Sequence, residues 1–167
     1  MDRYLCVIAE LDEETQHSLK MYEELILENG FRDRKAKGLP YHITLNTYSV
    51  EYEGYLKELL DVVKVNCKQI NVVFTSFGLF GLNVIYLNPA MNRALMELYD
   101  TAKEYSNSEY SVFAAHTTLF IGDPENTLKL LPEFVRIAKK TAGNLKYVSL
   151  YEFPSAILIK RVELLEE

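Results

Sequence analysis

The chain has 167 residues, of which 49% are apolar and 25% are charged, and its formal net charge is −6. This length and composition fit one compact globular domain, or two small lobes that share a core, and they exclude a disordered chain. The acidic balance argues against binding of duplex DNA or extended RNA, because neutralising phosphates supplies much of that affinity.

The sequence also lacks membrane and export signals. Residues 1–14 do not have the basic start and long apolar run of a signal peptide, and no stretch reaches the ~20 apolar residues that cross a bilayer. Cys6 and Cys67 lie far apart in apolar runs without metal-ligand spacing, which is typical of reduced thiols in a cytosolic protein. We therefore expect a cytoplasmic, monomeric protein with no membrane partner.

The first part of the chain alternates predicted strands and helices. Tyr4–Leu11 is apolar and β-prone, which predicts a buried strand, and Asp12–Asn29 has apolar residues at helical spacing. After a loop the pattern continues with further elements. They are a strand at Tyr41–Tyr48, a helix at Tyr52–Val65, and strands at Gln69–Phe77 and Leu82–Leu87 around a turn marked by Gly78 and Gly81.

The same order recurs in the second part of the chain. The predicted elements are a helix at about Pro89–Tyr105, a strand at Phe113–Ile121, a helix that begins near Asp123-Pro124, and strands at Leu145–Phe153 and Ala156–Leu164. Two halves, about 1–80 and 81–167, would thus repeat one strand–helix–strand–helix–strand–strand unit within a single domain. The expected fold is α+β, with mostly antiparallel sheets lining a central cleft and helices outside.

Two of the three histidines begin the same four-residue pattern, His42-Ile43-Thr44-Leu45 and His116-Thr117-Thr118-Leu119. With 9 Thr and 24 Leu in the chain, a histidine meets this pattern by chance with a probability of roughly 0.008. Two matches at equivalent places of the repeat therefore indicate function rather than packing. The third histidine, His17, lies among charged residues, and we interpret it as a surface residue.

The spacing of the motifs has a chemical meaning. Alternation along a strand puts His42 and Thr44 on one face, and His116 and Thr118 on one face likewise. If the halves are related by a pseudo-two-fold axis, these faces can oppose each other across a cleft. An imidazole with its ordinary pKa of ~6.5 can accept or donate a proton, and the hydroxyls can donate to phosphate oxygens. One histidine on each side would serve an in-line displacement at phosphorus, with neither a metal nor a cofactor.

The two tetrapeptides, their separation and the repeated layout resemble the 2H phosphoesterase superfamily, which includes the 2′-5′ RNA ligase-like proteins, over essentially the whole chain. That signature is two copies of His-x-Thr/Ser-x with a hydrophobic final residue; Thr117 departs from it slightly, since a more apolar residue is usual there. The resemblance implies a two-lobed fold and a catalytic set of His42, Thr44, His116 and Thr118. It further implies action on 2′,3′-cyclic phosphates or 2′-5′ links, with His116 as the base for water and His42 as the acid for the leaving oxygen.

Two features of the sequence allow two interpretations each. A basic cluster just before His42 is either a solvated loop or the positive rim of a phosphate site; it consists of Arg32, Arg34, Lys35 and Lys37. Four aromatic residues either stack a base or belong to the core; they are Tyr41, Phe77, Tyr151 and Phe153.

Two rival functions would use the same motifs. One is a non-catalytic module that holds a nucleotide or an RNA end in the same cleft, and the other is an interaction protein with vestigial motifs. Both motifs are intact, which argues against the second. Turnover of a 2′,3′-cyclic nucleotide would separate an enzyme from a binding module. In either case the expected partner is a small nucleotide or RNA end.

Overall fold

The computed structural model describes residues 2–107 and 113–166. Within these ranges the chain forms seven strands, four α-helices and one short 3-10 helix. The strands are β1 (Tyr4–Leu11), β2 (His42–Tyr48), β3 (Ile70–Phe80), β4 (Val84–Pro89), β5 (Thr117–Ile121), β6 (Thr141–Phe153) and β7 (Ile157–Glu163). The helices are α1 (Glu13–Glu28), η1 (Val50–Tyr52), α2 (Glu53–Asn66), α3 (Arg93–Thr101) and α4 (Pro124–Ile137).

Three of the helices begin at a capping side chain. The side chains of Asp12, Asn92 and Asp123 accept hydrogen bonds from backbone amides in the first turns of α1, α3 and α4, which satisfies donors that lack a partner within the helix. The cap at Asn92 also explains why α3 is shorter than predicted. Pro89 is the last residue of β4, so the chain is still extended where the sequence suggested a helix.

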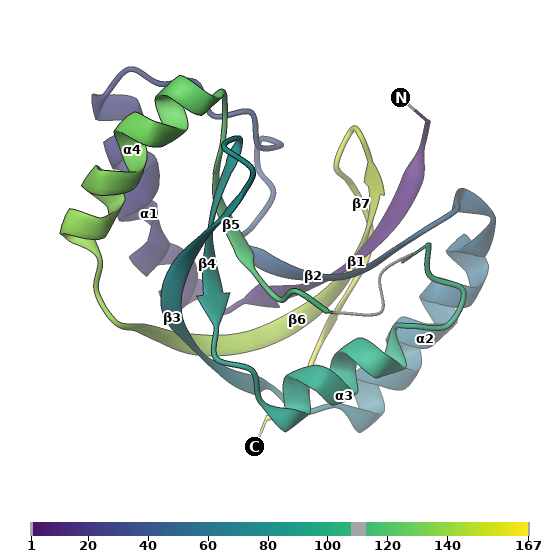
Figure 1. The fold of residues 1–167 in the computed structure, drawn as a ribbon. Coiled ribbons are helices and arrows are strands. Elements are labelled where there is room, and N and C mark those ends of the chain that lie inside the picture. The colour runs from purple at the N-terminus through teal and green to yellow at the C-terminus, as the bar shows by residue number, and fades with distance from the viewer. Residues whose placement is uncertain (1, 108–112, 167) are drawn as a thin grey trace.

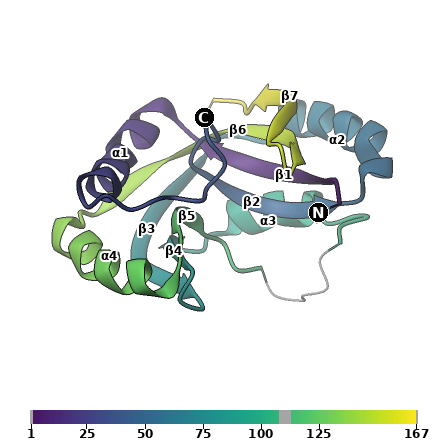
Figure 2. The same ribbon diagram turned by 90° about the horizontal axis from the view of Figure 1, so that it is seen from above.

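All seven strands belong to one sheet, with the order β2-β1-β6-β3-β4-β5 and with β7 paired to β6. Every pair of named strands is antiparallel. The sheet is strongly curved, and the helices lie outside the curve, with α1 and α4 toward one end and α2 and α3 toward the other (Figure 1 and Figure 2). The predicted α+β class is confirmed, with one continuous sheet where several were expected.

The two long strands, β3 and β6, tie the halves of the chain together. Residues 141–145 of β6 pair with residues 70–74 of β3, and the remainder of β6 pairs with β1. In the same way the second part of β3 pairs with β4. β3 of the first half thus pairs with β4 of the second half, and β6 of the second half pairs with β1 of the first; both strands run through the centre of the molecule (Figure 1). The halves share one core because of this exchange.

The structure corrects three details of the predicted repeat. β7 has no counterpart before residue 81, so the six-element unit holds only for the second half. His116 lies one residue before β5 rather than inside the strand. Gly78 is within β3, and the turn falls at Gly81, whose φ of 56° suits glycine. A Cβ at Gly78 would lie 2.4 Å from the ring of Tyr86, so this glycine lets the ring lie against the strand.

The largest core lies between the sheet and the helices. It takes Val7, Ala9 and Leu11 from β1, whereas Cys6 and Ile8 point to the other face and join a small cluster with Tyr151. The alternation follows from the period of two along a strand. No helix in the described part of the chain is long and apolar enough to span a membrane.

Candidate active site

The two histidine motifs come together because the curved sheet brings its ends into contact. β2 and β5 stand at opposite ends of the strand order, yet their residues are neighbours. Thr117, which is fully buried, donates a hydrogen bond of 2.6 Å from its Oγ1 to the backbone carbonyl oxygen of His42. The residue that departs from the family pattern is therefore a direct link between the motifs.

The faces of the two motifs agree with the alternation read from the sequence. Ile43, Leu45 and Leu119 are buried in the main core. The four remaining polar residues of the motifs are half-buried on the opposite face; they are His42, Thr44, His116 and Thr118. This arrangement leaves two imidazoles and two hydroxyls accessible to a ligand.

Each histidine is held in the same way by the backbone that precedes it. The Nδ1 of His42 lies 2.7 Å from the carbonyl oxygen of Pro40, and the Nδ1 of His116 lies 2.7 Å from that of Ala114. A carbonyl can only accept, so Nδ1 carries the hydrogen in both rings. In the neutral imidazole Nε2 is then the unprotonated nitrogen, free to take a proton from a ligand.

Both imidazoles have a lowered pKa. Burial lowers the pKa of His42 from its ordinary value of 6.5 to about 4; the bond to Pro40 opposes this, while repulsion from His116 and Lys35 adds to it. Burial also lowers the pKa of His116, again against the effect of its backbone bond to Ala114. The charge of His116 therefore acts on His42, and with both pKa values below 6.5 the neutral form of each ring dominates at pH 7.

The lowered pKa of His42 makes stability depend on pH. Between pH 6.5 and 4 the unfolded chain binds a proton at His42 that the folded protein does not, so we expect the free energy of unfolding to fall as the pH falls through this range. The loss amounts to roughly 3 kcal/mol at the acid end, and the effect is absent above pH 6.5. Urea unfolding at a series of pH values measures it. His42→Gln should remove this part of the slope and His17→Gln, at an exposed position, should not; an unchanged slope in His42→Gln would contradict the assignment.

A cavity of about 990 Å³ opens at the motifs, and we call it the site cavity. His42, Thr44 and Thr118 line it. His116 lies one residue before β5 and is not among the residues that line this cavity, although it is half-buried, as Thr118 is. Of the four aromatic residues considered above, Tyr41 and Phe153 line this cavity.

The other two aromatic residues lie elsewhere. Phe77 packs against Tyr22 and Phe134 beneath the helices, which is a core position. Tyr151 is buried in the small cluster with Cys6 and Ile8. In contrast to these two residues, Phe153 lines the site cavity, and its ring stacks on that of Tyr4 at 5.5 Å between centroids.

Two aromatic residues that the sequence did not single out surround His116. The edge of its ring meets Phe80 at 4.7 Å between centroids, and Tyr86 lies at 5.1 Å. Phe80 and Tyr86 stack on each other at 4.3 Å. Gly78 was the signal in the sequence that could have indicated an aromatic ring packed at this place, because the ring of Tyr86 occupies the position that a Cβ of residue 78 would take.

The structure also places the basic cluster, His17 and the two cysteines. All four cations of the basic cluster line the site cavity. His17 is exposed on α1, as predicted. Both cysteines are free, and burial raises the pKa of the Cys6 thiol to about 12. Over residues 2–107 and 113–166, no group of three or more His, Cys, Asp or Glu side chains is arranged to hold a metal ion.

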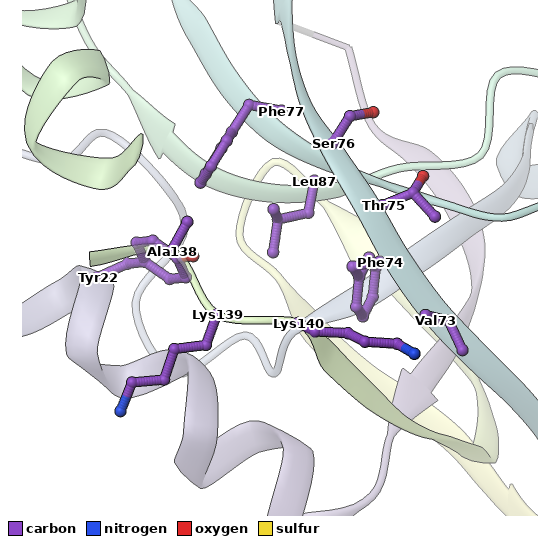
Figure 3. A pocket seen from close by; sticks show the side chains of 10 residues that line it. All are labelled: Tyr22, Val73, Phe74, Thr75, Ser76, Phe77, Leu87, Ala138, Lys139 and Lys140. Atoms are coloured by element: carbon purple, nitrogen blue, oxygen red, sulfur yellow. The ribbon is translucent and has the colours of Figure 1, made fainter. Parts of the chain in front are cut away.

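A second cavity, of about 430 Å³, lies away from the motifs. Residues of α1, β3 and β4 form it together with the segment before β6, and none of the four polar motif residues lines it. Figure 3 shows the side chains of Lys139 and Lys140 extending in opposite directions along that segment. This cavity holds no titratable pair comparable to the two histidines.

Comparison with known proteins identifies the fold. No protein-family model matches the sequence, and no curated protein matches it. Among solved structures, a phosphoesterase has a TM-score of 0.69 at 17% identity over 98% of this chain and 99% of its own. Escherichia coli LigT in its apo form has a TM-score of 0.64 at 18% identity, over 99% of both chains. Kluyveromyces marxianus Usb1 has a TM-score of 0.51 at 12% identity, over 97% of both chains. These likenesses confirm the fold that the resemblance to the 2H phosphoesterase superfamily implies.

Proposed function

We propose that the protein is a metal-independent phosphoesterase that opens 2′,3′-cyclic phosphates or cleaves 2′-5′ phosphodiester links in small nucleotides or RNA ends. The observation that carries the proposal is the matched pair of histidines. Each donates Nδ1–H to the carbonyl two residues before it, which makes Nε2 the basic nitrogen of the neutral ring, and the bond from Thr117 to the carbonyl of His42 holds the two motifs together. Paired titratable groups with shifted pKa values at a cavity are typical of catalytic sites.

The solved neighbours support a small nucleotide as the ligand. The E. coli protein LigT has been solved with NADP+, with ATP, with 3′-AMP and with phosphate. Its fold covers nearly the whole of this chain. The site cavity, at about 990 Å³, lies at the upper end of the roughly 300–1,000 Å³ that ligand sites occupy.

In the proposed reaction the phosphate lies between the two imidazoles. The neutral Nε2 of one histidine takes a proton from a water molecule as its oxygen attacks phosphorus, and the protonated Nε2 of the other gives its proton to the ribose oxygen that leaves. The hydroxyls of Thr44 and Thr118 donate hydrogen bonds to the non-bridging oxygens, where negative charge is concentrated. At the end the two histidines have exchanged protonation states, and solvent restores the starting form.

Electrostatics favour one division of roles. Burial lowers the pKa of both histidines, but repulsion from a cation, Lys35, acts on His42 and not on His116, which favours the proton of the pair on His116. We therefore assign His42 as the base and His116 as the acid in hydrolysis. This is the reverse of the division that the family resemblance implies, and the pH dependence of each single variant distinguishes the two.

The test of the proposal is turnover of a small panel of substrates by the purified protein. The panel holds a 2′,3′-cyclic nucleotide and a 2′-5′-linked dinucleotide, each assayed with and without excess EDTA, with products separated by chromatography. We expect hydrolysis of at least one substrate, at the same rate with chelator, because the proton transfers use only protein groups. Loss of activity with EDTA and its return with zinc or manganese would contradict the mechanism.

A non-catalytic binding module is the alternative. It predicts binding of 3′-AMP without turnover anywhere in the panel, and equal binding by the His42→Ala variant. The matched histidines argue for catalysis instead, since binding of an anion does not by itself require two imidazoles held in the same way at equivalent places of the two motifs.

A further inference from the structure

The connection between α1 and β2 forms one wall of the site cavity, and we call residues 31–40 the basic loop. Four cations on it line the same cavity as His42; they are Arg32, Arg34, Lys35 and Lys37. Among the residues that the structure describes, two carboxylates, Glu23 and Asp33, share that lining. The whole chain carries a formal charge of −6, so positive charge is concentrated at this one cavity against the balance of the protein.

The basic loop is fixed to the second half of the molecule. Oδ1 of Asp33 accepts hydrogen bonds from the backbone amides of Ile121, at 3.1 Å, and of Lys35, at 3.0 Å. The backbone amide of Arg34 donates to the carbonyl of Ile121 at 2.8 Å. Ile121 ends β5, the strand that carries Thr118. A loop of the first repeat is therefore anchored on the strand of the second motif, and its cations have a set position relative to both motifs.

Lys35 is the most enclosed of the four cations. Its side chain is 20% exposed, and its Nζ lies 3.4 Å from Oδ2 of Asp33 and 4.7 Å from the centroid of the Tyr41 ring. Its charge reaches His42, whose pKa it lowers. Lys35 is therefore engaged with Asp33 and Tyr41 and acts on His42 through its charge.

The other three cations are available for a different partner. Arg32, Arg34 and Lys37 are exposed, and within the part of the chain that the structure describes none of them forms an ion pair. Guanidinium and ammonium groups held on a fixed backbone are good donors to phosphate oxygens. Because the loop is already anchored, little conformational entropy is lost when it binds.

We propose that Arg32, Arg34 and Lys37 bind a second phosphate group of the substrate, apart from the phosphate that reacts. This inference rests on the proposed function and narrows its substrate class. The preferred substrates are nucleotides that carry another phosphate, such as a 5′-phosphate or an adjoining phosphodiester, over a nucleoside with the cyclic phosphate alone. The site cavity is large enough for both ends of such a ligand.

The experiment compares two substrates that differ by one group: adenosine 2′,3′-cyclic phosphate and its 5′-phosphorylated form. We expect the 5′-phosphate to raise kcat/KM about tenfold or more, the usual effect of a charge-assisted hydrogen bond. The variant R32A/R34A/K37A should lose most of this preference. The control variant K139A/K140A removes two cations at the second cavity and should keep it.

The variant Asp33→Ala tests whether the preference for the 5′-phosphate depends on the fixed position of the three cations or only on their charge. The substitution raises the positive charge at the site cavity but removes the anchor to Ile121. If position matters, the preference for the 5′-phosphate falls; if only charge mattered, it would rise, and the inference would be wrong.

Failure of this inference differs from failure of the proposed function. Equal kcat/KM for the two substrates, or an unchanged preference in R32A/R34A/K37A, overturns the second-phosphate site alone. If neither substrate is turned over, calorimetry with 3′-AMP and adenosine 3′,5′-bisphosphate makes the same comparison through binding. Tighter binding of the bisphosphate that depends on the three cations supports the site, and equal binding refutes it.

Discussion

Replacing either His42 or His116 by alanine should lower kcat/KM by roughly 10²–10⁴-fold, the usual contribution of a positioned acid or base. Each variant removes a group whose Nε2 has no substitute in the site. The hydrogen bond that is lost with the ring, from Nδ1 to the carbonyl of Pro40 or Ala114, is local, so the fold should survive. Steady-state kinetics on the best substrate of the panel measures the loss.

A matched control exists for these variants. His17→Ala changes an exposed histidine on α1 and should leave kcat/KM unchanged. Thermal unfolding of all three variants shows whether any loss of rate comes from loss of structure. A His42→Ala or His116→Ala protein that stays folded and keeps full activity would exclude that histidine from the reaction.

The rate should also depend steeply on pH, with its maximum on the acid side of 6.5. Hydrolysis needs one proton on the pair, and both histidines have a pKa below the ordinary value, with that of His42 at about 4. Above the higher of the two pKa values the singly protonated form declines tenfold per pH unit, so kcat/KM should fall about 10²-fold between pH 6.5 and 8.5. On the acid side the rate falls again once both rings are protonated.

The single variants assign the limbs of this profile. With His42 as the base, the residual activity of His42→Ala should lose the acid limb, because no remaining group must stay unprotonated. The residual activity of His116→Ala should lose the alkaline limb. The reverse assignment of limbs would support the division of roles that the family resemblance implies, and a maximum above pH 7 would contradict the lowered pKa values.

The sequence predicted the local geometry of the motifs well, because that geometry depends on neighbours in the chain. The period of two along a strand was enough to put His42 with Thr44 and to send Ile43 and Leu45 into the core, as the structure has them. Capping residues located the starts of α1 and α4 for the same reason, whereas the start of α3 was expected at Pro89, which ends β4. The repeat itself predicted that the two motifs would be equivalent.

Contacts between distant segments could not be read in this way. The bond from Thr117 to the carbonyl of His42 joins residues 75 apart, and that from Ile121 to Asp33 spans 88. Neither of these two hydrogen bonds produces a periodic pattern in the sequence. The sequence therefore showed Thr117 only as a slight departure from a pattern, and the basic cluster only as a run of charge.

The exchange of β3 and β6 between the halves was missed for a related reason. Both are unusually long strands, 11 and 13 residues, yet their pairing changes partner midway without any break in composition. Strand pairing is set by three-dimensional packing of faces, which alternation alone does not specify. Phe80 and Tyr86 were not predicted as neighbours of His116 for the same reason. Their contact with His116 depends on the pairing of β4 with β3 and β5.

The central claim is that the two histidines act as one unit on one phosphorus. The most direct test is the rate of the double variant H42A/H116A beside the two single variants on the same substrate. We expect the double variant to be little slower than the slower single variant, because removing either group already abolishes the paired transfer. Losses that multiply, so that the double variant shows the product of both single effects, would mean that the histidines work independently and would contradict it.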